Sequence, residues 1–228
     1  RHQRGFQQTF DLSTLYPADA TSRYAVAPQI EAGLQQNEEY FLATLSEKRE
    51  RIRLHDYDTI YRHAWLYEAV LYDKLSCRTP AEICRILNNI AVSAKIDLTN
   101  LNVLDLGGGS GIFSAALRTF LGIKHVSGLD ISQEAKEAAK RDRPGIYDSY
   151  YNVDLTALTR SEFDRLISSE FDCVGVASAT GWNNHIPVTG FATAFQILRR
   201  GGIFIFHVKR DPIDPECQEL YGWMDDLI

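Results

Sequence analysis

The 228-residue chain lacks an excess of positive charge, a cysteine framework and a long apolar run. Its formal net charge is −6, which argues against broad electrostatic capture of nucleic acid, because phosphate binding needs a basic face. Lysine and arginine do gather over residues 48–53, but Glu50 interrupts them, as on a solvated surface. No apolar stretch approaches the roughly 20 residues that span a bilayer. We therefore expect neither a nucleic-acid partner nor a membrane partner.

The four cysteines have spacings that match neither a zinc site nor a disulfide framework. They stand at Cys77, Cys84, Cys173 and Cys217. We expect free thiols in a reducing, cytoplasmic compartment, and no bound metal. Internal repeats and low-complexity segments are also lacking. A hydrophobic content of 45% is ordinary for a globular domain, and the length suffices for one sizeable core with an extension.

The second half of the chain alternates strand-like apolar runs with helical patterns. This alternation predicts an α/β fold with a parallel-rich sheet and helices on both faces. The strands are expected over residues 101–106, 124–130, 148–152, 171–178 and 202–208. The helices are expected over residues 111–121, 132–143, 160–168, 187–199 and 213–226.

The first 95 residues have a different pattern. Residues 1–27 show no period and predict an irregular arm, whereas apolar residues at helical multiples predict a long helix from Pro28 to about Arg53. Two further apolar stripes predict helices over 60–75 and 83–94. Thr79 is expected to cap the last of these, with Pro80 in its first turn.

These patterns divide the chain into two predicted parts. Residues 1–95 form an N-terminal arm and helical cap, which we expect to act as a lid. Residues 96–228 form the α/β core.

The stretch "VLDLGGGSG" at residues 103–111 is the most specific motif of the chain. A glycine loop directly after a buried strand suits a dinucleotide or S-adenosylmethionine. The dinucleotide fingerprint G-x-G-x-x-G fails, because its third glycine would fall on Ile112. Asp105 stands two residues before Gly107, where its carboxylate suits a cationic amino group and would repel a pyrophosphate. The motif therefore favours S-adenosylmethionine.

The motif resembles that of the class I S-adenosylmethionine-dependent methyltransferases, which have a Rossmann-like fold. The pattern D-x-G-x-G-x-G is met by Asp105, Gly107, Gly109 and Gly111, with Gly108 inside the loop. The family holds the ribose hydroxyls with an acid that ends the second strand, and "HVSGLDIS" supplies Asp130 at that place. Ile131 follows where the family packs a side chain against adenine.

Further segments extend the resemblance over about residues 58–210. "YYNVDL" resembles the motif after the third strand and nominates Asp154 and Leu155 for the adenine. "FDCVGVASATGW" resembles the fourth strand, whose end faces the methyl group, which nominates Ser178 for the cofactor. "FQILRRGGIFIFHV" resembles the helix, turn and fifth strand that follow. A tyrosine-rich segment over residues 55–75 nominates Tyr57 and Tyr61 as cofactor-covering residues.

The loop after the fourth strand is the expected acceptor site, because ligands of open parallel sheets gather beyond the carboxyl ends of the strands. It offers Thr180, Trp182 and Asn183 to orient an acceptor. His185 is the candidate general base, since its ordinary pKa of about 6.5 lies near neutrality. The alternative is a surface histidine beside Pro187.

The resemblance implies methyl transfer from S-adenosylmethionine to an oxygen, nitrogen or carbon of a small molecule, leaving S-adenosylhomocysteine. Three alternatives stay open: a binding or regulatory subunit without turnover, a protein methyltransferase and, less favoured, a nicotinamide oxidoreductase. Two departures from the family are expected. The Asn/Asp-Pro-Pro-Tyr signature of certain amino-N methyltransferases is missing, and no final strand hairpin follows the fifth strand.

Two candidate residues also have plain structural interpretations. Asp130 precedes Ser132, a good helix cap, and Asp154 is placed to close a turn.

Overall fold

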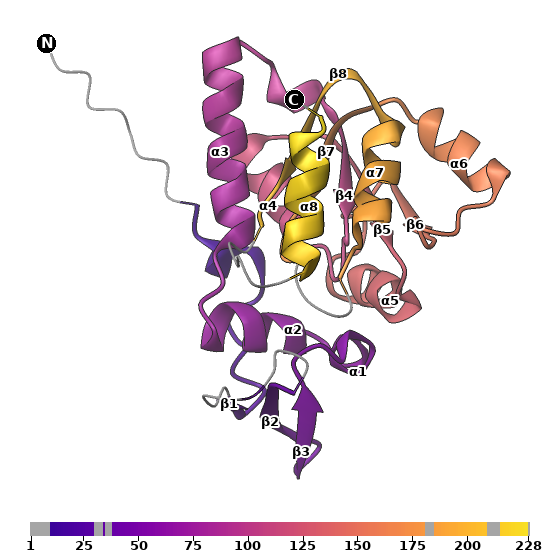
Figure 1. Ribbon diagram of the computed structural model, residues 1–228. Helices are drawn as coiled ribbons and strands as arrows, with labels where there is room; N and C mark the ends of the chain where they lie inside the picture. The colour runs from indigo at the N-terminus through magenta and orange to yellow at the C-terminus, as the bar shows by residue number, and fades with distance from the viewer. Residues whose placement is uncertain (1–9, 30–33, 35–37, 181–184, 209–214, 228) are drawn as a thin grey trace, which may run out of the picture.

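The computed structural model describes residues 10–29, 34, 38–180, 185–208 and 215–227 (Figure 1). A five-stranded, all-parallel sheet with the order β6-β5-β4-β7-β8 forms the core, as the strand–helix alternation predicted. Its strands are β4 (Asn102–Leu106), β5 (His125–Asp130), β6 (Ser149–Asn152), β7 (Phe171–Val176) and β8 (Leu198–Phe206). The helices that follow them are α4 (Ile112–Leu121), α5 (Gln133–Asp142), α6 (Arg160–Ile167), α7 (Val188–Ile197) and α8 (Pro215–Asp225).

Alternate residues of the central strands point to opposite faces of the sheet and build two hydrophobic clusters. On β4, Val103 belongs to the cluster shared with α3 (Thr79–Ala94) and α4, whereas Leu104 and Leu106 belong to the cluster shared with α6, α7 and α8. The sheet is thus covered on both sides, which is why its strands read as continuous apolar runs in the sequence.

The predicted long helix from Pro28 to Arg53 is wrong. The structure has a three-stranded antiparallel sheet in the order β1-β2-β3. Its strands are β1 (Val26–Gln29), β2 (Tyr40–Leu45) and β3 (Lys48–Arg53).

Two local signals explain the small sheet. Phe41, Ala43 and Leu45 are buried at every second residue of β2, the period of a strand. Ser46 and Glu47 both have positive φ angles, 46° and 69°, as a two-residue hairpin turn requires. Phe41 and Leu45, four residues apart, fit both this alternation and the helical spacing that suggested a helix.

The predicted helix over residues 60–75 is broken into three parts. Asp56 caps α1 (Tyr57–Arg62), and Trp65, with φ 63°, starts α2 (Leu66–Glu68). A π-helical stretch, Ala69–Lys74, follows. The helix α3 is confirmed, although Arg78 rather than Thr79 is its N-cap residue. The arm predicted to be irregular contains a short 3₁₀ helix, Leu12–Leu15.

In Figure 1, α1 and α2 lie between the small antiparallel sheet and the main sheet. The first hydrophobic cluster includes residues from Leu12 to Ile205, and α3 packs against α4. The boundary proposed at residue 95 stays a prediction, but it does not separate two hydrophobic cores. No helix of the described residues has both the length and the apolar character of a membrane span.

The close packing of β7 on α4 yields a test. A Cβ added at Gly175 would lie 2.6 Å from Cε1 of Phe113, so the ring must shift in a fully packed core. We expect Gly175→Ala to lower the free energy of unfolding by about 1–3 kcal/mol in urea denaturation. The matched control is Gly222→Ala in α8, where nothing lies within 4 Å of an added Cβ. Equal stability of the two variants would contradict this packing.

Candidate functional site

A cavity of about 570 Å³ opens at the carboxyl ends of β4, β5, β6 and β7. This is the point where the strand order reverses, the usual ligand site of an open parallel sheet. Residues that follow the strands line one side, including Leu106, Gly107, Asp130, Ile131, Ser132, Asp154, Leu155 and Ser178. The segment before and within α1 lines another, with His55, Tyr57, Asp58 and Tyr61. The volume falls in the usual range for small-molecule sites.

Asp130, at the end of β5, binds the loop after β4. Its Oδ2 accepts a hydrogen bond from the Gly109 amide at 3.0 Å, and its Oδ1 accepts one from the Ser132 amide at 2.9 Å. Burial raises the pKa of the Asp130 carboxyl, although these bonds act in the opposite direction. Ser132 also caps α5 by accepting from the Ala135 amide, and its hydroxyl donates to Asp58 of α1 at 2.6 Å. Asp130 therefore fits both interpretations of the sequence, because it lies beside the N-cap of α5 and also lines the cavity.

Three further residues nominated for the adenine line the cavity together. Ile131 leaves 68% of its surface exposed there, an apolar face available to a flat apolar group. Leu155 also lines the cavity and is buried in the second hydrophobic cluster. Asp154 closes a turn, since its Oδ1 accepts from the amide and the hydroxyl of Thr156 at 2.8 and 2.7 Å.

The glycines act mainly by letting other groups approach. Of the four, only Gly107 lines the cavity, and a Cβ there would lie 2.5 Å from Cβ of Ala179. At Gly108 an added Cβ would lie 2.7 Å from the Tyr147 hydroxyl, and at Gly109 it would overlap the Tyr61 hydroxyl. Gly111, with φ 90°, starts α4.

Asp105 does not line the cavity. It is 1% exposed and accepts hydrogen bonds from the Ser114 hydroxyl at 2.6 Å and the Tyr147 hydroxyl at 2.8 Å. On β4 it points to the same face as Val103, toward α4. The structure therefore places it beneath the glycine loop, where it supports the loop rather than facing a ligand.

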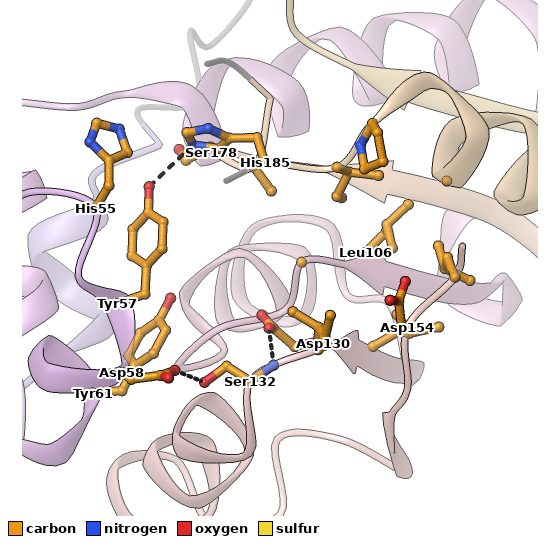
Figure 2. A pocket seen from close by; sticks show the side chains of 18 of the residues that line it. His55, Tyr57, Asp58, Tyr61, Leu106, Asp130, Ser132, Asp154, Ser178 and His185 are labelled. Carbon is orange, nitrogen blue, oxygen red and sulfur yellow. Dashed lines mark hydrogen bonds between the residues drawn. The ribbon is translucent and has the colours of Figure 1, made fainter. Parts of the chain in front are cut away.

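A wall of aromatic and imidazole side chains faces Asp130 across the cavity (Figure 2). The Tyr57 hydroxyl and Nε2 of His185 form a hydrogen bond of 3.1 Å, and the His55 and His185 rings meet edge to face at 5.3 Å. Burial raises the pKa of Tyr57, which keeps its hydroxyl protonated. Tyr61 stacks on Tyr57 with ring centroids 6.2 Å apart. Tyr57, Tyr61 and His185 were nominated from the sequence, whereas His55 was missed.

Of the remaining acceptor-site candidates, only Ser178 is found in the cavity lining within the described residues. Ser178 lines the cavity in a left-handed conformation, φ 62°. The Thr180 hydroxyl bonds instead to Nε2 of His207 at 3.1 Å, and Thr180 does not line the cavity. Trp182 and Asn183 lie outside the described residues. Within the described part of the chain, no group of three or more histidine, cysteine or acidic side chains is arranged to hold a metal ion.

The buried Asp105 yields a pH-dependent prediction. Burial raises the pKa of Asp105 to about 6, so between about pH 4 and 6 the native protein binds more protons than the unfolded chain. The stabilisation is complete below that range and is lost as the pH rises through it. We expect the free energy of unfolding to fall by about 3 kcal/mol more in the native protein than in Asp105→Asn between about pH 4 and 7. Parallel profiles in urea denaturation would contradict this.

Comparison with known proteins identifies the domain. Residues 103–202 match the model of a family described as a methyltransferase domain. No curated protein sequence matches the chain.

Several solved structures are similar in fold. S-adenosylmethionine-bound CalS10, an amino pentose methyltransferase from Micromonospora echinaspora, has 20% identity and a TM-score of 0.47 over 64% of this chain and 57% of its own. DhpI in complex with S-adenosylhomocysteine has 20% identity and a TM-score of 0.46 over 68% of each chain. A candidate RNA methyltransferase from Pyrococcus horikoshii has 20% identity and a TM-score of 0.43 over 66% of this chain and 65% of its own.

The chain therefore spans between 57% and 68% of the length of these three structures. The family match covers the glycine loop, Asp130 and the strands from β4 to the middle of β8. Residues 103–202 are therefore similar to a methyltransferase domain, and the strand order β6-β5-β4-β7-β8 is that of a Rossmann-like fold.

Proposed function

We propose that the protein transfers the methyl group of S-adenosylmethionine to a small-molecule acceptor. The observation that carries this proposal is the two-sided cavity. The cofactor-binding candidates after β5 and β6 form one side, and a phenol–imidazole wall forms the opposite side.

The residues present fit the cofactor. Ile131 offers an exposed apolar face for the adenine, and Asp130 offers carboxylate oxygens for the ribose hydroxyls. Gly107 lines the cavity, and its missing side chain lets Ala179 approach it where β4 and β7 end. Asp105 is left out of direct contact and supports the loop through Tyr147, whose hydroxyl donates both to Asp105 and to the Gly108 carbonyl.

S-adenosylmethionine, when bound, supplies a methyl group that its sulfonium has already activated. The work left to the protein is positioning, and well-oriented reactants recover about 7–11 kcal/mol of the barrier. Tyr57, Tyr61 and α1 cover the cavity, which keeps water from the reacting groups.

The phenol–imidazole wall accepts the proton that a hydroxyl or ammonium acceptor must lose. The acceptor atom loses its proton to Nδ1 of His185 as the methyl group is transferred. In this tautomer Nε2 is protonated and donates to the Tyr57 hydroxyl, which fixes the orientation of the ring. His55 packs against both side chains and restricts their movement. A carbon or unprotonated nitrogen acceptor needs no such base.

A small acceptor is favoured over a macromolecule by two features. The cavity is bounded by α1 and by the loop that carries His185, and the net charge of −6 disfavours nucleic acid. Cofactor binding without turnover, on any acceptor, would instead support a binding or regulatory subunit.

Titration calorimetry tests the cofactor side. We expect binding of S-adenosylhomocysteine and no binding of NAD or NADP. Asp130→Ala should weaken S-adenosylhomocysteine binding by about 10- to 150-fold, since hydrogen bonds to a charged group are worth about 1.5–3 kcal/mol. Asp148→Ala, at the amino end of β6 and therefore at the opposite end of the strands from the cavity, is the control and should keep the native affinity. Tight NAD binding would refute the proposal.

Measurement of turnover tests the role of His185 in the phenol–imidazole wall. A panel of small hydroxyl and amine compounds is assayed for S-adenosylhomocysteine release, and the best acceptor is used for the variants. We expect His185→Gln to lower kcat by about 10²- to 10⁴-fold with little change in cofactor affinity. His125→Gln, at the exposed start of β5, is the matched control. Full activity of His185→Gln would leave the wall a positioning role only, and a parallel loss of cofactor affinity would indicate a disturbed cavity.

A further inference from the structure

A buried ion pair lies behind the glycine loop, outside the cavity. Glu68 of α2 is fully buried, and its Oε1 lies 2.7 Å from Nη1 of Arg143. Arg143 is the C-cap residue of α5, and its guanidinium also lies over the Trp65 ring at 4.8 Å. The pair thus joins the N-terminal segment to the end of α5.

The same ion pair holds the loop. The Ser110 hydroxyl donates to Oε1 of Glu68 at 2.8 Å, and Nη1 of Arg143 donates to the Ser110 carbonyl at 3.1 Å. Ser110 is 1% exposed and stands between Gly109 and Gly111, which have φ angles of 50° and 90°. With flexible glycines on both sides, the anchored serine fixes the course of the loop.

The hydrogen bonding of the buried Glu68–Arg143 pair is incomplete in the described part of the chain, so stabilisation of the fold does not by itself explain the pair. Oε1 of Glu68 takes both partners, while Oε2, as well as Nε of Arg143, has no hydrogen-bond partner among the described residues. A buried ion pair with unsatisfied atoms is weak evidence for stabilisation, because desolvation offsets the attraction. In some proteins such pairs are retained for the conformation that they specify rather than for stability.

The conformation in question is that of the loop facing Asp130. The Gly109 amide donates to Asp130 on the cavity side, and the next residue, Ser110, is held by Glu68 from behind. Tyr61, also from the N-terminal segment, packs against Gly109. The left-handed Trp65 and the π-helical stretch Ala69–Lys74 flank Glu68, so irregular backbone is concentrated where the segment meets the loop.

We propose that Glu68 is a positioning residue that, through Ser110, sets the glycine loop for cofactor binding and couples that binding to residues 66–74. The inference rests on the cofactor site proposed above. It predicts that a ligand which holds the loop also stabilises the segment that anchors it.

Ser110→Ala is the deciding variant, because it removes the side-chain link from Glu68 to the loop and leaves intact both the Glu68–Arg143 pair and the bond from Arg143 to the Ser110 carbonyl. We expect its affinity for S-adenosylhomocysteine to fall about 10-fold in titration calorimetry, since the lost bond is to a charged group. In the native protein, S-adenosylhomocysteine should slow amide hydrogen exchange over residues 66–74. In Ser110→Ala that protection should be lost, with little change in the thermal midpoint.

Ser127→Ala in β5 is the matched control, a serine that is 7% exposed and forms part of neither the link nor the cavity lining. It should keep both the affinity and the protection. Glu68→Gln leaves the buried guanidinium without an anionic partner, so we expect it to lower the thermal midpoint as well as the affinity.

The outcomes separate the two proposals. Native protein that does not bind S-adenosylhomocysteine would overturn the proposed function and this inference with it. Native binding combined with unchanged affinity and unchanged protection in Ser110→Ala would overturn the positioning role alone. A fall in stability without a change in affinity would also overturn it, because it would make the link purely structural.

Discussion

The attachment of the glycine loop to the end of β5 is the constraint on which the site depends. The amides of Gly107 and Gly108 both donate to the Leu129 carbonyl, at 2.8 and 3.0 Å, and the Gly109 amide donates to Asp130. Three successive amides are thereby fixed by the neighbouring strand. Because β4 and β5 are parallel and adjacent, their carboxyl ends meet, and the loop must turn over the end of β5. The cavity lies beside this turn, with Gly107 and Asp130 in its lining.

Several residues that break local rules lie close to the same loop. Trp65 takes a left-handed conformation, the next helix becomes π-helical, and Glu68 buries a carboxylate with one unpartnered oxygen. The positive φ angles at Ser46 and Glu47, by contrast, belong to a turn, and on α6 local preference and structure agree in the capping box of Thr159 and Glu162. Proteins tend to break local rules at functional sites, which supports a role for the N-terminal segment beyond covering the sheet.

The opposite wall of the cavity is assembled from distant parts of the chain. Tyr57 and His185 are separated by 128 residues and meet only because α1 lies over the carboxyl ends of the strands (Figure 2). His55 joins them two residues after β3, the last strand of the small antiparallel sheet. A helix was predicted in place of this sheet. A motif identifies a residue within one segment, so it had no means of pairing His55 with His185.

The sequence by itself determined the parallel core, the glycine loop and the acid after β5. Each is encoded locally, by apolar runs of strand length, by glycines that tolerate positive φ, and by one carboxylate at a strand end. Tertiary structure alone decided the rest. Asp105 turned away from the cavity because alternate residues of β4 face opposite sides of the sheet, and its side falls on Ser114 and Tyr147. The partners of Ser110 and His185 lie 42 and 128 residues away. Such contacts follow from how elements pack, which no short stretch of sequence specifies.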